Sequence, residues 1–148
     1  MKIPAYIHDL DTWRDSFQFF TPIHVRFSET DAFGHVNNTV AFVYFEQARL
    51  QFFERHGLMK QWLKKPMETM IVTADLQCDY IAQMKYGDTI EIGVKVDKLG
   101  TSSFDVHYVG LNNGEVCLTG RGTLVQVDVN TGRARPIGET SLAALQAL

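Results

Sequence analysis

Two different periods of apolar and polar residues divide this chain into two parts. In the second half the apolar residues recur at every other position, which is typical of half-buried antiparallel strands. In 70–80 the even positions are mostly apolar, and the same parity holds in the next two segments. The pattern predicts strands over 70–80, 90–96, 104–108 and 115–129. Within the last of these, Gly120 and Gly122 indicate a bulge or a close approach of backbone.

The first half predicts a strand followed by a long helix. Apolar and polar residues alternate over 21–27, and Pro22 is tolerated only near a strand's beginning or on an edge strand. From Asn38 to His56 there is no proline or glycine, and Gly57 is placed to end a helix. Apolar residues spread around most of this helix, so we expect it to be buried on nearly all sides. At 1.5 Å per residue it is roughly 28 Å long.

The remaining segments predict a single domain over 1–148. An N-terminal extension, 1–20, has Leu10, Trp13 and Phe17 at helical spacing, and 138–148 is a possible C-terminal helix. The strongest of the turn signals is Asn113-Gly114, a hairpin dipeptide. A chain of 148 residues buries about 70% of its unfolded surface, enough for one core. The expected order is one strand, the long helix and a meander of four strands.

Composition argues against several classes of partner. The chain has 14 Lys and Arg against 17 Asp and Glu, a formal net charge of −3, so we expect neither nucleic acid nor an anionic membrane surface to be its partner. Cys78 and Cys117 form no CxxC pair, which predicts buried free thiols rather than a disulfide framework or zinc ribbon. The start lacks the apolar core of a signal peptide, and no apolar run approaches the roughly 20 residues of a membrane span. We therefore expect a cytoplasmic protein.

One segment, 24–49, has the sequence HVRFSETDAFGHVNNTVAFVYFEQAR and resembles a known family signature. It is similar to hot-dog thioesterases of the 4-hydroxybenzoyl-CoA thioesterase type. The matching residues are Asp31, Gly34, His35, Val36, Asn38, Glu46, Ala48 and Arg49. The resemblance implies an α+β hot-dog fold, a curled five-stranded antiparallel sheet wrapped around one long helix. One departure is Ala41, where the family often has a tyrosine, so the shape of the acyl pocket does not carry over.

The resemblance also implies hydrolysis of an acyl-CoA thioester to free acid and CoA. By position, Asp31 is the base or nucleophile, and the backbone N–H groups of Val36, Asn37 and Asn38 are candidates to polarise the carbonyl. A thioester needs little more than this, because its thiolate leaves without much help from an acid. The plainer alternative for Asp31 is a loop acid that accepts backbone hydrogen bonds. Gly34 allows either close approach of substrate or a positive φ.

Two further motif residues have more than one interpretation. His35 either hydrogen-bonds the thioester region, orients Asp31, or has a purely structural role. Glu46 lies among apolar residues of the helix, where a carboxylate needs a partner. Arg49, three residues later, supplies one, which favours a buried ion pair over an assisting carboxylate at the pocket wall.

Several alternatives stay open at the level of sequence. The second enzymatic interpretation is a hot-dog enoyl-thioester hydratase or dehydratase, with His35 and Glu46 across the substrate; the third is a non-catalytic acyl-thioester binding protein. The expected partner is acyl-CoA, or an acyl-carrier-protein thioester, with no metal or organic cofactor. The family implies a homodimer or homotetramer. Candidate cations for the CoA phosphates are Lys60, Lys64, Lys65, Lys85, Lys98 and Arg121.

Overall fold

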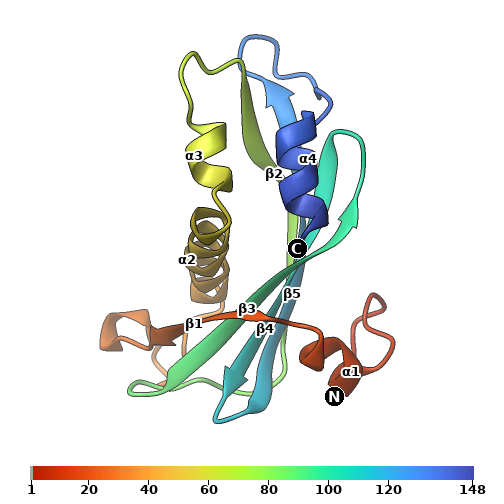
Figure 1. The fold of residues 1–148 in the computed structure, drawn as a ribbon. Helices are drawn as coiled ribbons and strands as arrows, with labels where there is room; N and C mark the ends of the chain where they lie inside the picture. The colour runs from red at the N-terminus through yellow and green to blue at the C-terminus, as the bar shows by residue number, and fades with distance from the viewer. Residues whose placement is uncertain (1) are drawn as a thin grey trace.

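Five antiparallel strands and four helices make up the computed structural model, which describes residues 2–148 (Figure 1). The strands are β1 (Phe19–His24), β2 (Thr69–Tyr80), β3 (Thr89–Leu99), β4 (Ser103–Asn112) and β5 (Glu115–Asp128). The helices are α1 (Leu10–Asp15), α2 (Val40–Arg55), α3 (Leu58–Trp62) and α4 (Glu139–Gln146), with a 3-10 turn, η1 (Phe27–Glu29). The α+β hot-dog arrangement, including the C-terminal helix, is confirmed.

The strand order in the sheet is β1-β3-β4-β5-β2, which corrects the expected meander of four strands. Only β3, β4 and β5 are consecutive neighbours, while β2 pairs with β5 and lies at an edge. The first strand also ends earlier than predicted, at His24, because the chain turns into η1, where Phe27 is 75% exposed. Pro22 lies on β1, the other edge strand, as its missing N–H requires.

Strand β2 changes its inward parity half way along. Its register against β5 shifts between Thr73 and Asp75, a bulge at Ala74. After the bulge Leu76 and Cys78 pack against the core, as the even-position pattern predicts. Before the bulge it is the odd residue Ile71 that does so, while Met70 is 39% exposed. A bulge adds one residue to one strand, so it reverses which residues face the helix.

Helix α2 is buried on one side only, contrary to the expectation of burial nearly all round. Its buried residues are Ala41, Tyr44, Phe45, Ala48, Phe52 and Phe53, which face the sheet. On the opposite side Val43 is 54% and Leu50 is 40% exposed. Gly57 ends the helix with φ of 76°, as predicted, and α3 follows at once. The exposed stripe on α2 is an apolar surface with no cover in residues 2–148.

Helix α2 packs closely against the sheet at Gly120. A Cβ at this position would lie 2.5 Å from the Phe45 ring and 3.0 Å from the carbonyl oxygen of Gln77. The prediction of close backbone approach is therefore confirmed for Gly120, and also for Gly122, where a Cβ would lie 2.7 Å from the carbonyl oxygen of Asp75. The Phe45 ring also stacks on Tyr108, with centroids 4.5 Å apart.

The N-terminal extension covers the outer face of the sheet, opposite α2 (Figure 1). Ile7, Trp13 and Phe17 form a second small core with Val109. His107, an outward residue on β4, is buried beneath this cover at 3% exposure. The indole Nε1–H of Trp13 donates a hydrogen bond to His107 Nδ1 at 3.0 Å. This bond requires Nδ1 to be unprotonated, so His107 is neutral in the fold.

We predict that Gly120→Ala lowers the free energy of unfolding by about 1–3 kcal/mol, because the added methyl group meets the Phe45 ring. Chemical denaturation measures it. In a Phe45→Leu background the same substitution is expected to cost less, because the smaller side chain leaves room. Equal costs in both backgrounds would contradict this account of the contact.

We also predict acid sensitivity from His107. Burial is the main cause that lowers its pKa to about 4; Lys95 and Arg121 act in the same direction, against Asp97 and Asp105. The unfolded chain then binds a proton near pH 6.5 that the fold excludes, so stability is lost as pH falls from about 6.5 towards 4, by on the order of 3 kcal/mol.

His107→Gln keeps an acceptor for Trp13 without a titrating ring. Unfolding free energies measured between pH 7 and pH 4 should therefore fall less steeply for this variant than for the original chain. His24→Gln, at an exposed histidine, serves as the control and is expected to follow the original chain. Identical pH profiles for His107→Gln and the original chain would overturn the assignment.

Candidate active site

The motif segment around Asp31 folds into a tight loop between η1 and α2. Thr30 pairs with Val36 in an antiparallel bridge, and the N–H of Asp31 donates to the carbonyl oxygen of His35 at 2.8 Å. Gly34 turns the chain with φ of 80°, and a Cβ there would meet nothing within 4 Å. Gly34 is therefore explained by its positive φ.

The carboxylate of Asp31 is held on one oxygen and free on the other. Its Oδ1 accepts the backbone N–H groups of Phe33, at 2.9 Å, and His35, at 3.3 Å. Its Oδ2 accepts no hydrogen bond from any residue in 2–148. The side chain is half-buried. Both interpretations of Asp31 thus describe part of its geometry, since one oxygen fixes the loop and the other is available for chemistry.

The three candidate N–H groups differ in what they bind. The N–H of Val36 donates to Met84 at 2.8 Å, and that of Asn37 donates to Glu29 at 2.9 Å, both to carbonyl oxygens. The N–H of Asn38 has no acceptor within the described chain. Of the three, only the Asn38 N–H is available to a substrate in this conformation.

His35 is half-buried beside a small pocket of 160 Å³. The pocket is lined by His35, Val36, Tyr80, Ile81, Ala82, Gln83 and Met84. His35 also pairs with Lys85 in a backbone bridge, which places that lysine next to the motif loop. Glu46 does not line this pocket, so one chain does not bring together the His35 and Glu46 pair of the hydratase interpretation.

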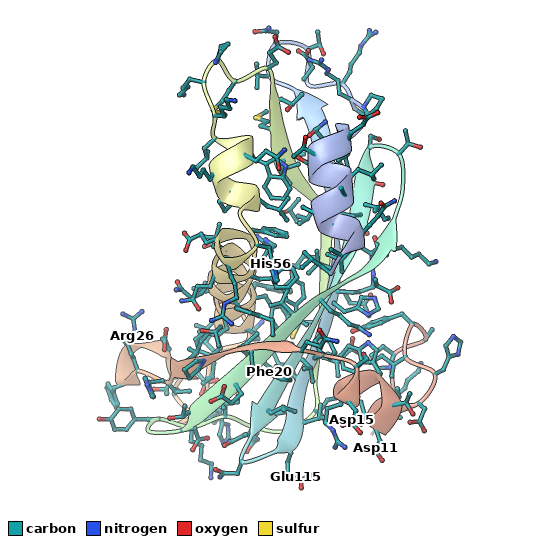
Figure 2. All side chains as sticks on the ribbon, viewed as in Figure 1. Asp11, Asp15, Phe20, Arg26, His56 and Glu115 are labelled. Atoms are coloured by element: carbon teal, nitrogen blue, oxygen red, sulfur yellow. The ribbon has the colours of Figure 1, made fainter. Side chains whose placement is uncertain are left out.

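Three residues that the sequence argument missed hold the loop in place. Glu29 accepts the hydroxyl of Tyr44 at 2.9 Å, which ties η1 to α2, and it also accepts the backbone N–H of Arg26. Burial alone would raise the pKa of Glu29, but these hydrogen bonds outweigh it and the pKa is lowered. Tyr80, at the end of β2, donates its hydroxyl to the carbonyl oxygen of Asn38. Figure 2 shows the Arg26 side chain at the periphery of the molecule, beyond β1.

The predicted ion pair between Glu46 and Arg49 is wrong. Glu46 is exposed on the outward side of α2 and makes no salt bridge with any described residue. Arg49 instead donates from Nη1 to the hydroxyl of Tyr108 at 3.0 Å. Two apolar neighbours of Glu46, Val43 and Leu50, are themselves exposed, and Glu46 is exposed beside them, so its carboxylate stays in water and needs no partner.

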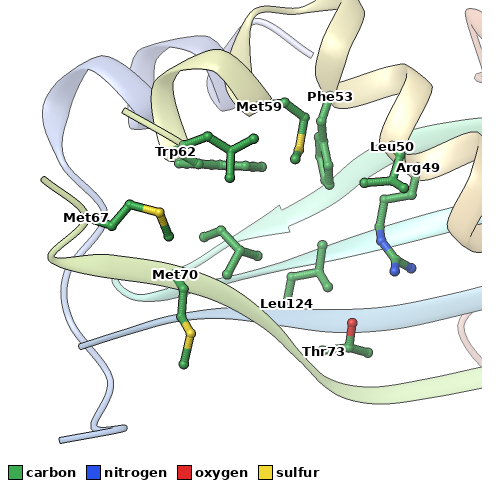
Figure 3. Close-up of a pocket in the computed structure, with 11 residues that line it drawn as sticks. Arg49, Leu50, Phe53, Met59, Trp62, Met67, Met70, Thr73 and Leu124 are labelled. Atoms are coloured by element: carbon green, nitrogen blue, oxygen red, sulfur yellow. The ribbon is translucent and has the colours of Figure 1, made fainter. Parts of the chain in front are cut away.

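Arg49 lies in the wall of an apolar pocket of 210 Å³ (Figure 3). Helices α2 and α3 form one side of the pocket, and β2 and β5 form the other. Its lining is Arg49, Leu50, Phe53, Met59, Trp62, Leu63, Met67, Met70, Ile71, Thr73 and Leu124. The size and apolar lining are those of a site for a small apolar group.

The candidate phosphate-binding cations separate into three groups. Arg121 is engaged on the outer face by Asp75 at 3.4 Å and Asp105 at 3.3 Å. Lys85 alone of the six lies beside the motif loop. The others, Lys60, Lys64, Lys65 and Lys98, are exposed on α3, on its connection to β2, or on β3.

Three other observations bear on the chemistry. No cluster of three or more His, Cys, Asp or Glu side chains in residues 2–148 is arranged to hold a metal ion. No helix in the same residues has the length and hydropathy to cross a membrane. Both cysteines are free; Cys117 is buried and Cys78 half-buried, and burial raises the pKa of each thiol to about 12.

Solved structures with this architecture include a predicted thioesterase and a thioesterase, both bacterial. One is described as a predicted thioesterase from Bacillus stearothermophilus; it is 33% identical, with 87% of this chain and 94% of that chain covered and a TM-score of 0.76. The other is a thioesterase from Thermus thermophilus complexed with coenzyme A and Zn; it is 31% identical, with 90% and 95% covered and a TM-score of 0.76.

Sequence comparison agrees with the structural likeness. The chain is 43% identical over 136 residues to "Uncharacterized protein YsmA" of Bacillus subtilis (strain 168), with 90% of each chain covered. The family model described as the thioesterase-like superfamily matches residues 25–145, from the end of β1 to α4. With the motif loop, the long helix and the sheet from β2 to β5 all inside this match, the chain belongs to the thioesterase-like superfamily.

Proposed function

We propose that this protein hydrolyses acyl-CoA thioesters and that Asp31 is its catalytic carboxylate. The observation that carries the proposal is the division of labour on Asp31, whose Oδ1 is fixed by two backbone N–H groups while Oδ2 is free. The free N–H of Asn38 follows in the same loop, just before α2. The coenzyme A bound by the Thermus thermophilus relative supports a CoA thioester as substrate.

The proposed reaction needs one base and one electrophilic donor. Asp31 either takes a proton from a water that attacks the thioester carbon, or attacks that carbon itself before water releases the acid. Negative charge develops on the carbonyl oxygen, where the Asn38 N–H and the start of α2 stabilise it. The carbon–sulfur bond then breaks, and CoA leaves as a thiolate that gains a proton. The acid and CoA are the products.

The nucleotide end of CoA has suitable groups near this loop. Lys85 pairs with His35, and the next residue, Tyr86, stacks edge-on against Phe27 with centroids 5.9 Å apart. Both rings are exposed, at 65% and 75%. A lysine next in sequence to one of two exposed aromatic rings in contact suits a phosphate attached to an adenine.

We also propose a homodimer formed through β2. This edge strand is 12 residues long and is paired on one side only, and exposed edges of this kind seek a partner. Val43 and Leu50 on α2 and Tyr80 at the end of β2 also expose apolar surface. Antiparallel pairing of β2 with its copy would bring the Tyr80 end of one chain next to the Met70 end of the other. The motif loop of one chain would then adjoin the 210 Å³ pocket of its partner.

No specific observation favours the two alternatives. An enoyl-thioester hydratase would use His35 with Glu46, but Glu46 lies on the exposed side of α2, away from the pocket that His35 lines. A binding protein without catalysis would not depend on the free oxygen of Asp31. The Asp31 variants below separate binding from hydrolysis.

We predict that Asp31→Asn reduces acyl-CoA hydrolysis by about 10²–10⁴-fold, the usual cost of losing a general base. The fold should be kept, because the amide oxygen of asparagine can accept the same two N–H groups as Oδ1 does. Thiol release from acyl-CoAs of graded length measures the rate, and equilibrium binding of the substrate to the variant measures affinity.

Two further variants control this experiment. Asp31→Ala excludes recovery of activity by deamidation of the asparagine. Asp15→Asn, on α1, removes an exposed carboxylate outside the motif loop and is expected to leave the rate unchanged. Hydrolysis by both Asp31 variants within threefold of the original chain would reduce Asp31 to a structural loop acid.

For the dimer, we predict that Val43→Glu produces a monomer at micromolar concentration. Val43 is exposed in the single chain, so the substitution should leave the monomer folded, but the carboxylate would be buried unpaired in the interface. Sedimentation velocity measures the mass. Gln18→Glu adds the same charge next to β1, at the other edge, and should stay dimeric. A monomeric original chain with full activity would refute the dimer.

A further inference from the structure

The apolar pocket beside α3 contains one charged group that the rest of the structure does not neutralise. Arg49 is half-buried, and no carboxylate in residues 2–148 lies within salt-bridge distance of its guanidinium. Its one side-chain hydrogen bond runs from Nη1 to the Tyr108 hydroxyl. A guanidinium has five N–H donors in a planar fork, so most of its donors stay available.

The pocket is polar at one end and apolar at the other. Figure 3 shows the Arg49 guanidinium and the Thr73 hydroxyl at one end, and Trp62 and Met67 at the other. The Thr73 side chain is exposed, so its hydroxyl is open to water or to a ligand. An apolar ligand alone would cover these donors without replacing the water that they bind, at a cost in affinity. A ligand with an oxygen atom at that end avoids this cost.

We infer that the pocket selects acyl groups that carry an oxygen function, and that Arg49 is the specificity-determining residue. The inference rests on the proposed function in one respect, that the ligand is the acyl part of a thioester. The oxygen belongs either to a hydroxyl or oxo group near the thioester or to a carboxylate at the far end of the chain. In both cases it accepts a hydrogen bond from the guanidinium, while the carbon chain lies against Phe53, Trp62 and Leu124.

The pocket volume sets the size of the acyl group. An engineered apolar cavity of about 150 Å³ binds benzene, or about 25 Å³ per carbon atom. On this scale the 210 Å³ pocket holds about eight carbon atoms. Eight-carbon acyl groups are therefore the appropriate probes.

Arg55 lies on the same helix but does not line the pocket, so it serves as the comparison residue. Its guanidinium lies 5.2 Å from the centroid of the Phe19 ring, and its side chain is exposed to water. Arg49 instead turns into the molecule, reaches the buried Tyr108 and borders the pocket. The two residues form a matched pair for testing.

The experiment compares octanoyl-CoA, 3-hydroxyoctanoyl-CoA and octanedioyl-CoA as substrates. We expect kcat/KM to be at least tenfold higher for one of the two oxygenated substrates than for octanoyl-CoA, the range of a charge-assisted hydrogen bond. Which one is preferred tells whether the oxygen lies near the thioester or at the far end. In Arg49→Met the ratio should fall to near one, in Arg49→Lys it should fall only partly, and in Arg55→Met it should be unchanged.

A ratio within threefold of one in the original chain overturns the inference, whether or not Arg49→Met folds. A ratio that survives in a folded Arg49→Met overturns the role of Arg49. Equilibrium binding of the same three acyl-CoAs to Asp31→Asn separates this inference from the proposed function, because it needs no hydrolysis. Arg49-dependent preference for an oxygenated acyl-CoA in this binding assay supports the inference even if the original chain cleaves no acyl-CoA. Equal affinity for all three acyl-CoAs contradicts it even if octanoyl-CoA is cleaved.

Discussion

The contact of Phe45 with Gly120 and Tyr108 determines where helix α2 lies on the sheet. Phe45 is fully buried, its ring stacks on Tyr108, and there is no room for a Cβ at Gly120. A well-packed core does not deform gradually, so this contact sets both the depth and the rotation of the helix. The motif loop depends on the seated helix in turn, because Tyr44, next to Phe45, holds Glu29 in η1. In the proposed reaction, the Asn38 N–H of a loop held in this way needs no reorganisation when charge develops on a substrate. Donors that are already in place are the main source of electrostatic catalysis.

Periodicity predicted the elements well because it reports a property local to each segment. The alternating strands, the long helix with Gly57 after it and the C-terminal helix all appear. Which residues face the core, and which strands pair, is not a local property of a segment. An apolar residue such as Val43 looks the same in sequence whether the sheet or solvent faces it, and one bulged residue, Ala74, reverses the parity of a strand. The place of β2 beside β5 likewise depends on long-range pairing that no local pattern encodes.

The site shows the same limit on a smaller scale. The motif located the loop and left two interpretations of Asp31, and the structure makes them compatible, because each concerns a different oxygen. The hydrogen bonds that hold the loop were missed, since they link elements distant in the chain. The pairing of Glu46 with Arg49 failed for a related reason. A spacing of three residues places two side chains on one side of a helix. The arginine side chain is long enough to reach acceptors on other elements, and here it donates to the Tyr108 hydroxyl of β4.

The motif loop and the apolar pocket lie apart within one chain, and this separation bears on the proposed dimer. From its start at Val40 to Arg49 the helix advances about 14 Å, at 1.5 Å per residue, so the loop and the pocket of one chain lie at different levels along α2. The exposed residues Val43 and Leu50 lie on the stretch between Asn38 and the far end of the pocket. A second chain packed on that stretch in antiparallel fashion would bring loop and pocket to the same level. In this arrangement the second chain would cover the exposed apolar residues of α2, and it would also place a motif loop next to each pocket.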